Sequence, residues 1–318
     1  MTKFLIRRLL QAIPTLLAVS VVMFIIIHLA PGGPTAIYAM DPNVDQKELE
    51  RIEERLGLND PLPIQYSKWL KAMLSGDWGL SYKFNRPVID ILAERIGPSI
   101  QLVGAALLIA LVFSIPFGMF SALYRNRFVQ YLANAVAMLG VSIPTFWLGM
   151  VILLFFSVRW RIIPSGGMMT IGSEGWDLWD RLWHLLPPAL VLATLQVAAW
   201  SRYVRSSMLE VIGQDYIRTA RSKGLRERAV VVRHALKNAL LPLITLVGLQ
   251  GGNLIGGAMI TEVVFAWPGM GRLLAESLTG RDYPVLMASF MLMSTLTIFG
   301  NMMADVCYGL VDPRIRLE

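Results

Sequence analysis

The chain is poor in charged residues. Asp, Glu, Lys and Arg make up 16% of its 318 residues, whereas hydrophobic residues make up 55% and the mean hydropathy is +0.55. A soluble globular chain typically has about 25% charged residues. A soluble enzyme of this length would need more polar surface than this composition supplies. The shortage therefore argues against a soluble enzyme and indicates an integral membrane protein.

Cysteine is almost absent, because Cys307 is the single example. This excludes an intramolecular disulfide and a cysteine-based metal site. The chain has no Gly-Lys dipeptide, and so no phosphate-binding P-loop, and it has no His-Glu-x-x-His motif. We therefore expect no catalytic residues, metal or cofactor in this chain, and ATP would have to be bound by another chain.

Six charge-free runs are long enough to cross a bilayer, which requires about 20 mostly apolar residues. They are residues 9–30, 96–124, 128–158, 182–201, 238–261 and 283–304. We predict a transmembrane helix in each, and hence an all-α protein. The first run is too long for a signal peptide and no small-residue cleavage site follows it, so it is predicted to be retained.

The distribution of charge predicts that both termini are cytoplasmic. With the N-terminus inside, the inside ends and the hairpin loop 124–127 contain basic residues but no acid before Asp312, as the positive-inside rule favours. The net charge of +7 is then explained by the membrane, so we expect no nucleic-acid partner.

The chain is predicted to divide into three parts. Residues 1–30 form an N-terminal segment and the first transmembrane helix. Residues 31–95 form an extracytoplasmic region with ten acids, eight bases and an amphipathic helix at 46–56. Residues 96–318 form the core, with a cytoplasmic loop at 202–239.

The most informative segment is the basic stretch 206–242. Helical spacing places Tyr216, Thr219, Ala220, Lys223 and Gly224 on one face. The face is small at its centre, which would let a partner's backbone approach closely, and its last residue is a candidate C′ glycine. The residues alone leave two alternatives open: a basic loop on anionic lipid, or a helix that docks into a partner's groove.

This segment resembles the coupling loop of the membrane permease subunits of ABC importers. That family has a Glu-Ala-Ala-x-x-x-Gly motif followed by Leu-Pro. Here the glutamate and the first alanine are replaced, as Arg218-Thr219-Ala220, Gly224 and Leu241-Pro242 show. These departures are similar to the oligopeptide/dipeptide/nickel branch, whose Asp-Tyr-x-x-Thr-Ala-Arg-x-Lys-Gly and Arg-His-x-x-x-Asn motifs correspond to 215–224 and 233–238.

The resemblance runs from end to end of the chain. Further segments similar to motifs of this branch are 76–81 (Gly-Asp-Trp-Gly-Leu-Ser), 142–147, 262–271 and 308–314. The long first outside loop resembles the first of the two permease types in such systems.

The resemblance implies a six-helix permease of the type I ABC importer fold in the cytoplasmic (inner) membrane. It implies a second permease subunit, two ATPase subunits that bind ATP and Mg, and an extracytoplasmic substrate-binding protein as partners. Di- or oligopeptides are the implied cargo, with nickel chelates or oligosaccharides as alternatives. The residues implied to couple the chain to the ATPase are Asp215, Tyr216, Thr219, Ala220, Lys223 and Gly224.

Polar residues within the predicted spans are candidates to line the translocation path. We favour Gln250 and Asn253, which lie in a glycine-rich run, and add Asn134 and Gln196. Hydrogen bonding between helices is the competing interpretation.

The rival class of function is a six-helix secondary transporter or channel. It would need intramembrane charge for ion coupling, and only Glu262 and Asp305 are available. We expect both to lie near a membrane interface, where Glu262 would cap a helix, pair with Arg272 or be solvated.

Overall fold

The computed structural model describes residues 2–29, 33–35, 45–55, 57–124, 128, 135, 138–172, 177–250 and 258–311. The regular structure of these residues is helical, apart from one isolated bridge between Leu80 and Pro87. The four long helices are α1 (Thr2–Leu29), α4 (Val88–Leu123), α7 (Leu178–Ile212) and α14 (Tyr283–Val311).

Shorter helices connect and cap these four. On the way from α1 to α4 and from α4 to α7 they are η1 (Gly33–Thr35), α2 (Gln46–Arg55), α3 (Leu62–Leu74), α6 (Thr145–Ile152) and η3 (Leu153–Arg159). Between α7 and α14 they are α8 (Asp215–Ser222), α9 (Glu227–Ala229), η4 (Val230–Leu236), α10 (Lys237–Ala239), α11 (Leu241–Gln250), α12 (Met259–Val264) and α13 (Met270–Thr279). The segments η3 and η4 are π-helical.

Four of the predicted spans correspond to long apolar helices, namely α1, α4, α7 and α14. The segments Glu227–Ala239 and Leu241–Gly248 make a fifth if their 41° bend is counted within one span. The remaining predicted span, 128–158, is represented by the apolar helix Thr145–Arg159, and much of its first half lies outside the described residues. The six-span prediction is therefore supported for four or five spans.

All four long helices are longer than the apolar runs that predicted them. Helix α4 begins at Val88 rather than at residue 96, and α7 continues to Ile212 rather than ending near 201. Charged residues ended both predicted runs, but a helix needs apolar side chains only where it lies in lipid. Its polar ends can continue into water while keeping their backbone hydrogen bonds. The first eleven residues of the predicted loop 202–239 are therefore helical.

The core of the molecule is the α4–α7 pair. Small residues recur every three or four positions along the second half of the buried face of α4: Ala106, Ala110, Ser114, Gly118 and Ser121. At Gly118 the two backbones are so close that a Cβ atom would lie 2.6 Å from the carbonyl oxygen of Ser201 and from Cβ of Val204. Small residues at such crossings let membrane helices pack tightly.

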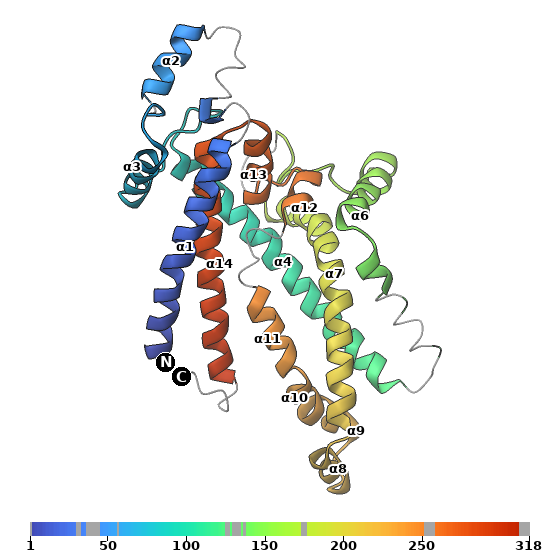
Figure 1. The fold of residues 1–318 in the computed structure, drawn as a ribbon. Helices are drawn as coiled ribbons and strands as arrows, with labels where there is room; N and C mark the ends of the chain where they lie inside the picture. The colour runs from blue at the N-terminus through green and yellow to red at the C-terminus, as the bar shows by residue number, and fades with distance from the viewer. Residues whose placement is uncertain are drawn as a thin grey trace.

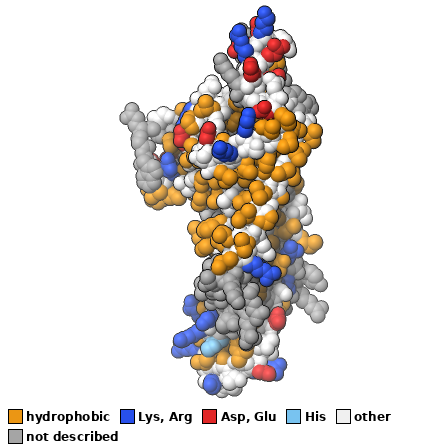
Figure 2. Space-filling model, turned by 60° about the vertical axis from the view of Figure 1, so that its left-hand side comes forward, with side chains coloured by type: hydrophobic (Ala, Val, Ile, Leu, Met, Phe, Trp, Pro, Cys, Tyr) orange, Lys and Arg blue, Asp and Glu red, His pale blue; other side chains and the backbone are white. Residues whose placement is uncertain are grey.

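The beginning of α1 and the end of α14 lie toward the same end of the molecule as α8 (Figure 1). Helices α1 and α14 run side by side, and α2 lies at the opposite end from α8 (Figure 1). An ion pair of 2.6 Å joins Arg8 near the start of α1 to Asp305 near the end of α14. Figure 2 shows a band of hydrophobic side chains on one face, with charged side chains gathered above and below it. This arrangement fits a membrane-spanning body with two polar ends.

Candidate functional site

Helix α8 projects from the end of the molecule as a short separate helix (Figure 1). Asp215 lies in its first turn, where a carboxylate interacts favourably with the helix dipole. The helix ends at the C-cap residue Lys223, and Gly224 follows with a φ of +76°. The backbone N–H of Gly224 donates to the carbonyl oxygen of Arg221 at 2.9 Å. The predicted C′ role of this glycine is thus confirmed, since glycine adopts positive φ without steric cost.

The buried face of α8 packs against its own chain. Ile217 is fully buried and Ala220 is 6% exposed. Both belong to one hydrophobic cluster with residues of η4 and α7, including Val230, Ala235 and Met208. The expectation that Ala220 forms a notch open to a partner is therefore wrong. Its small side chain instead lets α8 lie close to η4, an arrangement that helical spacing within α8 alone could not reveal.

Polar contacts fix both ends of α8. The amide Nδ2 of Asn238 in α10 donates to the hydroxyl Oη of Tyr216 at 2.9 Å. Arg221 donates two hydrogen bonds to the carboxylate of Glu227, at 3.1 Å and 2.6 Å. These bonds join the last turn of α8 to α9 through an exposed ion pair.

The outward face of α8 is polar. The side chains of Asp215 and Arg218 are 97% and 74% exposed, and they approach each other to 3.6 Å. The other exposed members of the helix and its C-cap are Tyr216, Thr219, Arg221, Ser222 and Lys223. Of the six residues implied to contact an ATPase, five are therefore exposed, and Ala220 supports them from below.

Gly224 allows a test of how this site depends on backbone shape. No atom lies within 4 Å of a Cβ built at Gly224, so its role here is conformational. We expect Gly224→Ala to impair transport. The left-handed conformation costs alanine about 1–2 kcal/mol, which disfavours the native end of α8. Gly224→Asn should keep most activity, because asparagine tolerates this conformation.

The measurement is transport and ATP hydrolysis by the assembled complex carrying each variant. If the glycine instead makes room for a partner, Gly224→Asn should be at least as damaging as Gly224→Ala. That order of effects would contradict the conformational role.

The residues predicted to line a path are only partly described. Asn134 and Asn253 lie outside the described residues, and of Gln250 only the backbone at the end of α11 is described. Gln196 lies in α7, and its Oε1 atom is buried without a hydrogen-bond partner among the described residues. A buried amide oxygen without such a partner suits a position next to a path or another subunit, but the role of Gln196 stays a prediction.

At the opposite end of the molecule, Glu262 is fully buried. Its carboxylate accepts a hydrogen bond of 2.6 Å from the Ser99 hydroxyl of α4 and one of 3.0 Å from the backbone N–H of Arg272. The Ser99 hydroxyl in turn accepts from the backbone N–H of Met270 at 2.8 Å. Glu262 therefore caps α13 from outside that helix and ties it to α4. The expected capping by Glu262 is confirmed, and the expected solvation is wrong. Glu262 does contact Arg272, but through the backbone N–H and not through an ion pair with the guanidinium.

A second buried carboxylate ties the motif at 76–81 to the start of α14. Asp282 accepts from the hydroxyl of Ser81 and from the backbone N–H groups of Tyr82 and Lys83, at 2.5, 3.2 and 3.3 Å. The motif containing Ser81 was singled out from sequence, but its partner was missed. In the sequence, a single acid before a transmembrane run is expected to be solvated. Ser81 and Asp282 come together only in the folded chain.

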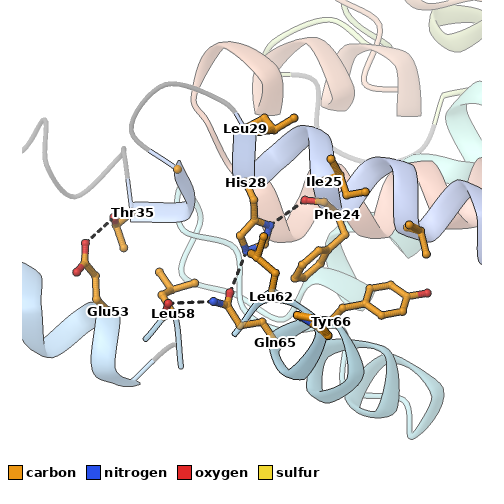
Figure 3. A pocket seen from close by; sticks show the side chains of 13 residues that line it. Phe24, Ile25, His28, Leu29, Thr35, Glu53, Leu58, Leu62, Gln65 and Tyr66 are labelled. Carbon is orange, nitrogen blue, oxygen red and sulfur yellow. Dashed lines mark hydrogen bonds between the residues drawn. The ribbon is translucent and has the colours of Figure 1, made fainter. Parts of the chain in front are cut away.

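A cavity of about 620 Å³ lies between the end of α1 and the helices α2 and α3 (Figure 3). His28 is one of its polar lining residues, and its ring nitrogens lie 2.8 Å from the carbonyl oxygen of Phe24 and 3.0 Å from Oε1 of Gln65. The amide nitrogen of Gln65 donates to the carbonyl oxygens of Leu58 and Asp60. These hydrogen bonds connect the end of α1 to α3 beside the cavity.

Comparison with known proteins supplies the family. Residues 114–317 match the family described as binding-protein-dependent transport system inner membrane component, and residues 1–103 match its N-terminal counterpart. The oligopeptide transport system permease protein AppB of Bacillus subtilis is 42% identical over 317 residues, covering 99% of this chain and all of that protein. The glutathione transport system permease protein GsiC of Escherichia coli K12 is 39% identical over the full length of both chains.

A solved structure shares the fold. The MetNI methionine ABC transporter, in an inward-facing conformation, matches with a TM-score of 0.57 and 18% identity. The match covers 70% of this chain and 97% of that one, and at this identity it is evidence for the fold alone. With the family matches, these findings show that the chain belongs to the binding-protein-dependent transport system inner membrane components, which are multi-pass permeases of the cytoplasmic membrane.

Proposed function

We propose that this chain is one of two permease subunits of an ATP-driven importer of short peptides. The observation that carries the proposal is its full-length similarity to permeases named for oligopeptide and glutathione transport. In this proposal the chain itself is not catalytic. ATP and Mg are bound by two ATPase subunits, and an extracytoplasmic binding protein delivers the peptide.

Helix α8 is the proposed contact with the ATPase. Its exposed polar face and its firmly packed opposite face suit a rigid element that a partner can push. ATP binding would close the ATPase dimer, α8 would move with it, and the transmembrane helices would turn the central path toward the outside. The end of the molecule that contains α8 and the start of α1 is then cytoplasmic, as the charge distribution predicts.

Glu262 and Asp305 are the two acids that could couple transport to ion movement, and their contacts argue against an ion-driven transporter. Asp305 is paired with Arg8, and Glu262 is held by Ser99 and by backbone N–H groups. Ion coupling requires a group that gains and loses its ion during transport. Both carboxylates instead have fixed structural partners.

The test is uptake by liposomes that contain the complex purified through a tag on this chain. Tritiated trialanine and the binding protein are added outside, and ATP is enclosed inside. We expect uptake that requires both ATP and the binding protein. Uptake without ATP would favour the rival class, and a binding protein that retains a nickel chelate or an oligosaccharide on isolation would replace the peptide substrate.

A further inference from the structure

One side-chain contact joins α8 to the beginning of the next transmembrane segment. Tyr216 and Asn238 are 22 residues apart, and their hydrogen bond of 2.9 Å runs from α10 to the first turn of α8. Asn238 is also held by the preceding segment η4, because its amide nitrogen donates to the carbonyl oxygen of His234 at 3.3 Å. The amide is therefore oriented toward Tyr216 before any partner binds.

The position of Asn238 gives this bond its importance. Helix α10 ends at Ala239, and α11 begins two residues later at Leu241, after a bend of 41° between the segments. Helix α11 packs against α7 and α14 and ends at Gln250, in the region predicted to line the path. A displacement of α10 is thus passed directly to the start of α11.

The other contacts of α8 do not link it to α10 by a hydrogen bond. Ile217 and Ala220 pack against η4 through apolar contacts, which are non-directional. The Arg221–Glu227 pair joins the last turn of α8 to α9, at the other end of α8 from Tyr216. A hydrogen bond has a preferred direction, so the Tyr216–Asn238 bond favours one angle of α8 relative to α10.

We propose that Tyr216 and Asn238 are positioning residues that transmit the movement of α8 to α11. This inference rests on the proposed function and adds to it a specific route of transmission. Both residues that form the bond are exposed, Tyr216 to 43%. The bond therefore contributes little to the free energy of folding. Its loss should change coupling rather than stability or assembly.

The experiment compares substitutions that break or keep the bond in the assembled complex in liposomes. Tyr216→Phe and Asn238→Leu remove it. Asn238→Asp keeps it with reversed polarity, because the tyrosine hydroxyl can donate to the carboxylate. The readouts are trialanine imported per ATP hydrolysed, co-purification with the ATPase, and the melting temperature. Tyr203→Phe, an exposed tyrosine of α7, is the matched control.

We expect each bond-breaking variant to import about fivefold less peptide per ATP. The double variant should be no worse than either single variant, because both remove one contact. Asn238→Asp should retain coupling, and should lose it when Tyr216→Phe is added. Assembly and melting temperature should stay as in the Tyr203→Phe control.

Three results would overturn the inference. Tyr216→Phe and Asn238→Leu could keep normal import per ATP, or their losses could add in the double variant, or either could detach the ATPase. The first two would show that the bond transmits nothing, and the third that it serves docking. A wild-type complex with no ATP-dependent peptide uptake would instead contradict the proposed function, so the two failures are distinguishable.

Discussion

Glu262→Ala is expected to destabilise the protein by about 3 kcal/mol or more, because it leaves two donors without an acceptor at about 1–3 kcal/mol each. The carboxylate accepts from Ser99 and from the backbone N–H of Arg272, at the beginning of α13. Gly269, the N-cap residue of α13, has no side chain that could replace it. The measurement is the thermal unfolding midpoint in detergent, together with the yield of folded protein.

Two further variants serve as comparisons. One removes the negative charge but keeps the shape of the side chain, and the other removes an exposed carboxylate. Glu262→Gln keeps the shape but turns an amide N–H₂ toward donors, so an intermediate loss is expected. Glu94→Ala removes a carboxylate of an exposed ion pair with Arg86, and should cost no more than about 1 kcal/mol. A Glu262→Ala variant as stable as Glu94→Ala would show that the buried carboxylate does not hold α4 and α13 together.

Gly118→Ala is expected to separate the α4–α7 pair and to destabilise the protein by about 1–3 kcal/mol, as overpacking typically does. The added methyl group would lie 2.6 Å from the carbonyl oxygen of Ser201, which belongs to a helix backbone and cannot rotate away. Gly104→Ala in the same helix is the matched control, because a Cβ there meets no atom within 4 Å.

The control should be neutral or slightly stabilising, since alanine favours a helix more than glycine does. Melting temperature and the yield of assembled complex measure both variants. If Gly118→Ala has the same melting temperature as Gly104→Ala, the close approach of α4 and α7 at this crossing is not needed for the fold.

The sequence predicted those features that depend on local pattern. Long apolar runs located α1, α4, α7 and α14, and Gln46–Arg55 forms the amphipathic helix expected near 46–56. The C′ glycine was also predictable, because glycine after a helical run has a specific backbone reason. The helix ends were less predictable. Charged residues show where a helix leaves the lipid, but its backbone hydrogen bonds can continue into water.

Features that depend on distant contacts could not be predicted. Helical spacing grouped Ala220 with Tyr216, Thr219 and Lys223, but the fold buries Ala220 beside Ile217 and leaves the other three exposed. The sequence does not say which face of α8 packs against its own chain. Glu262 and Asp282 are single acids near apolar runs, and their burial depends on Ser99 and Ser81, which lie more than 160 residues earlier. Tyr216 and Asn238 both lie in recognisable motifs, yet their bond forms only because the chain turns between Ser222 and Glu227 and brings the helix Glu227–Ala239 back against α8.

The most direct test of the central claim is to ask which end of this chain contacts the ATPase. Cys307 is the single cysteine, so a Cys307→Ser background allows one cysteine to be placed at will. Arg218→Cys puts it on the exposed face of α8, and Arg51→Cys puts it on α2 at the opposite end. Each is labelled with a benzophenone maleimide and irradiated in the intact complex. The account predicts cross-linking to the ATPase from Arg218→Cys and none from Arg51→Cys; the reverse pattern, or no ATPase adduct from Arg218→Cys in a complex that still hydrolyses ATP, would contradict it.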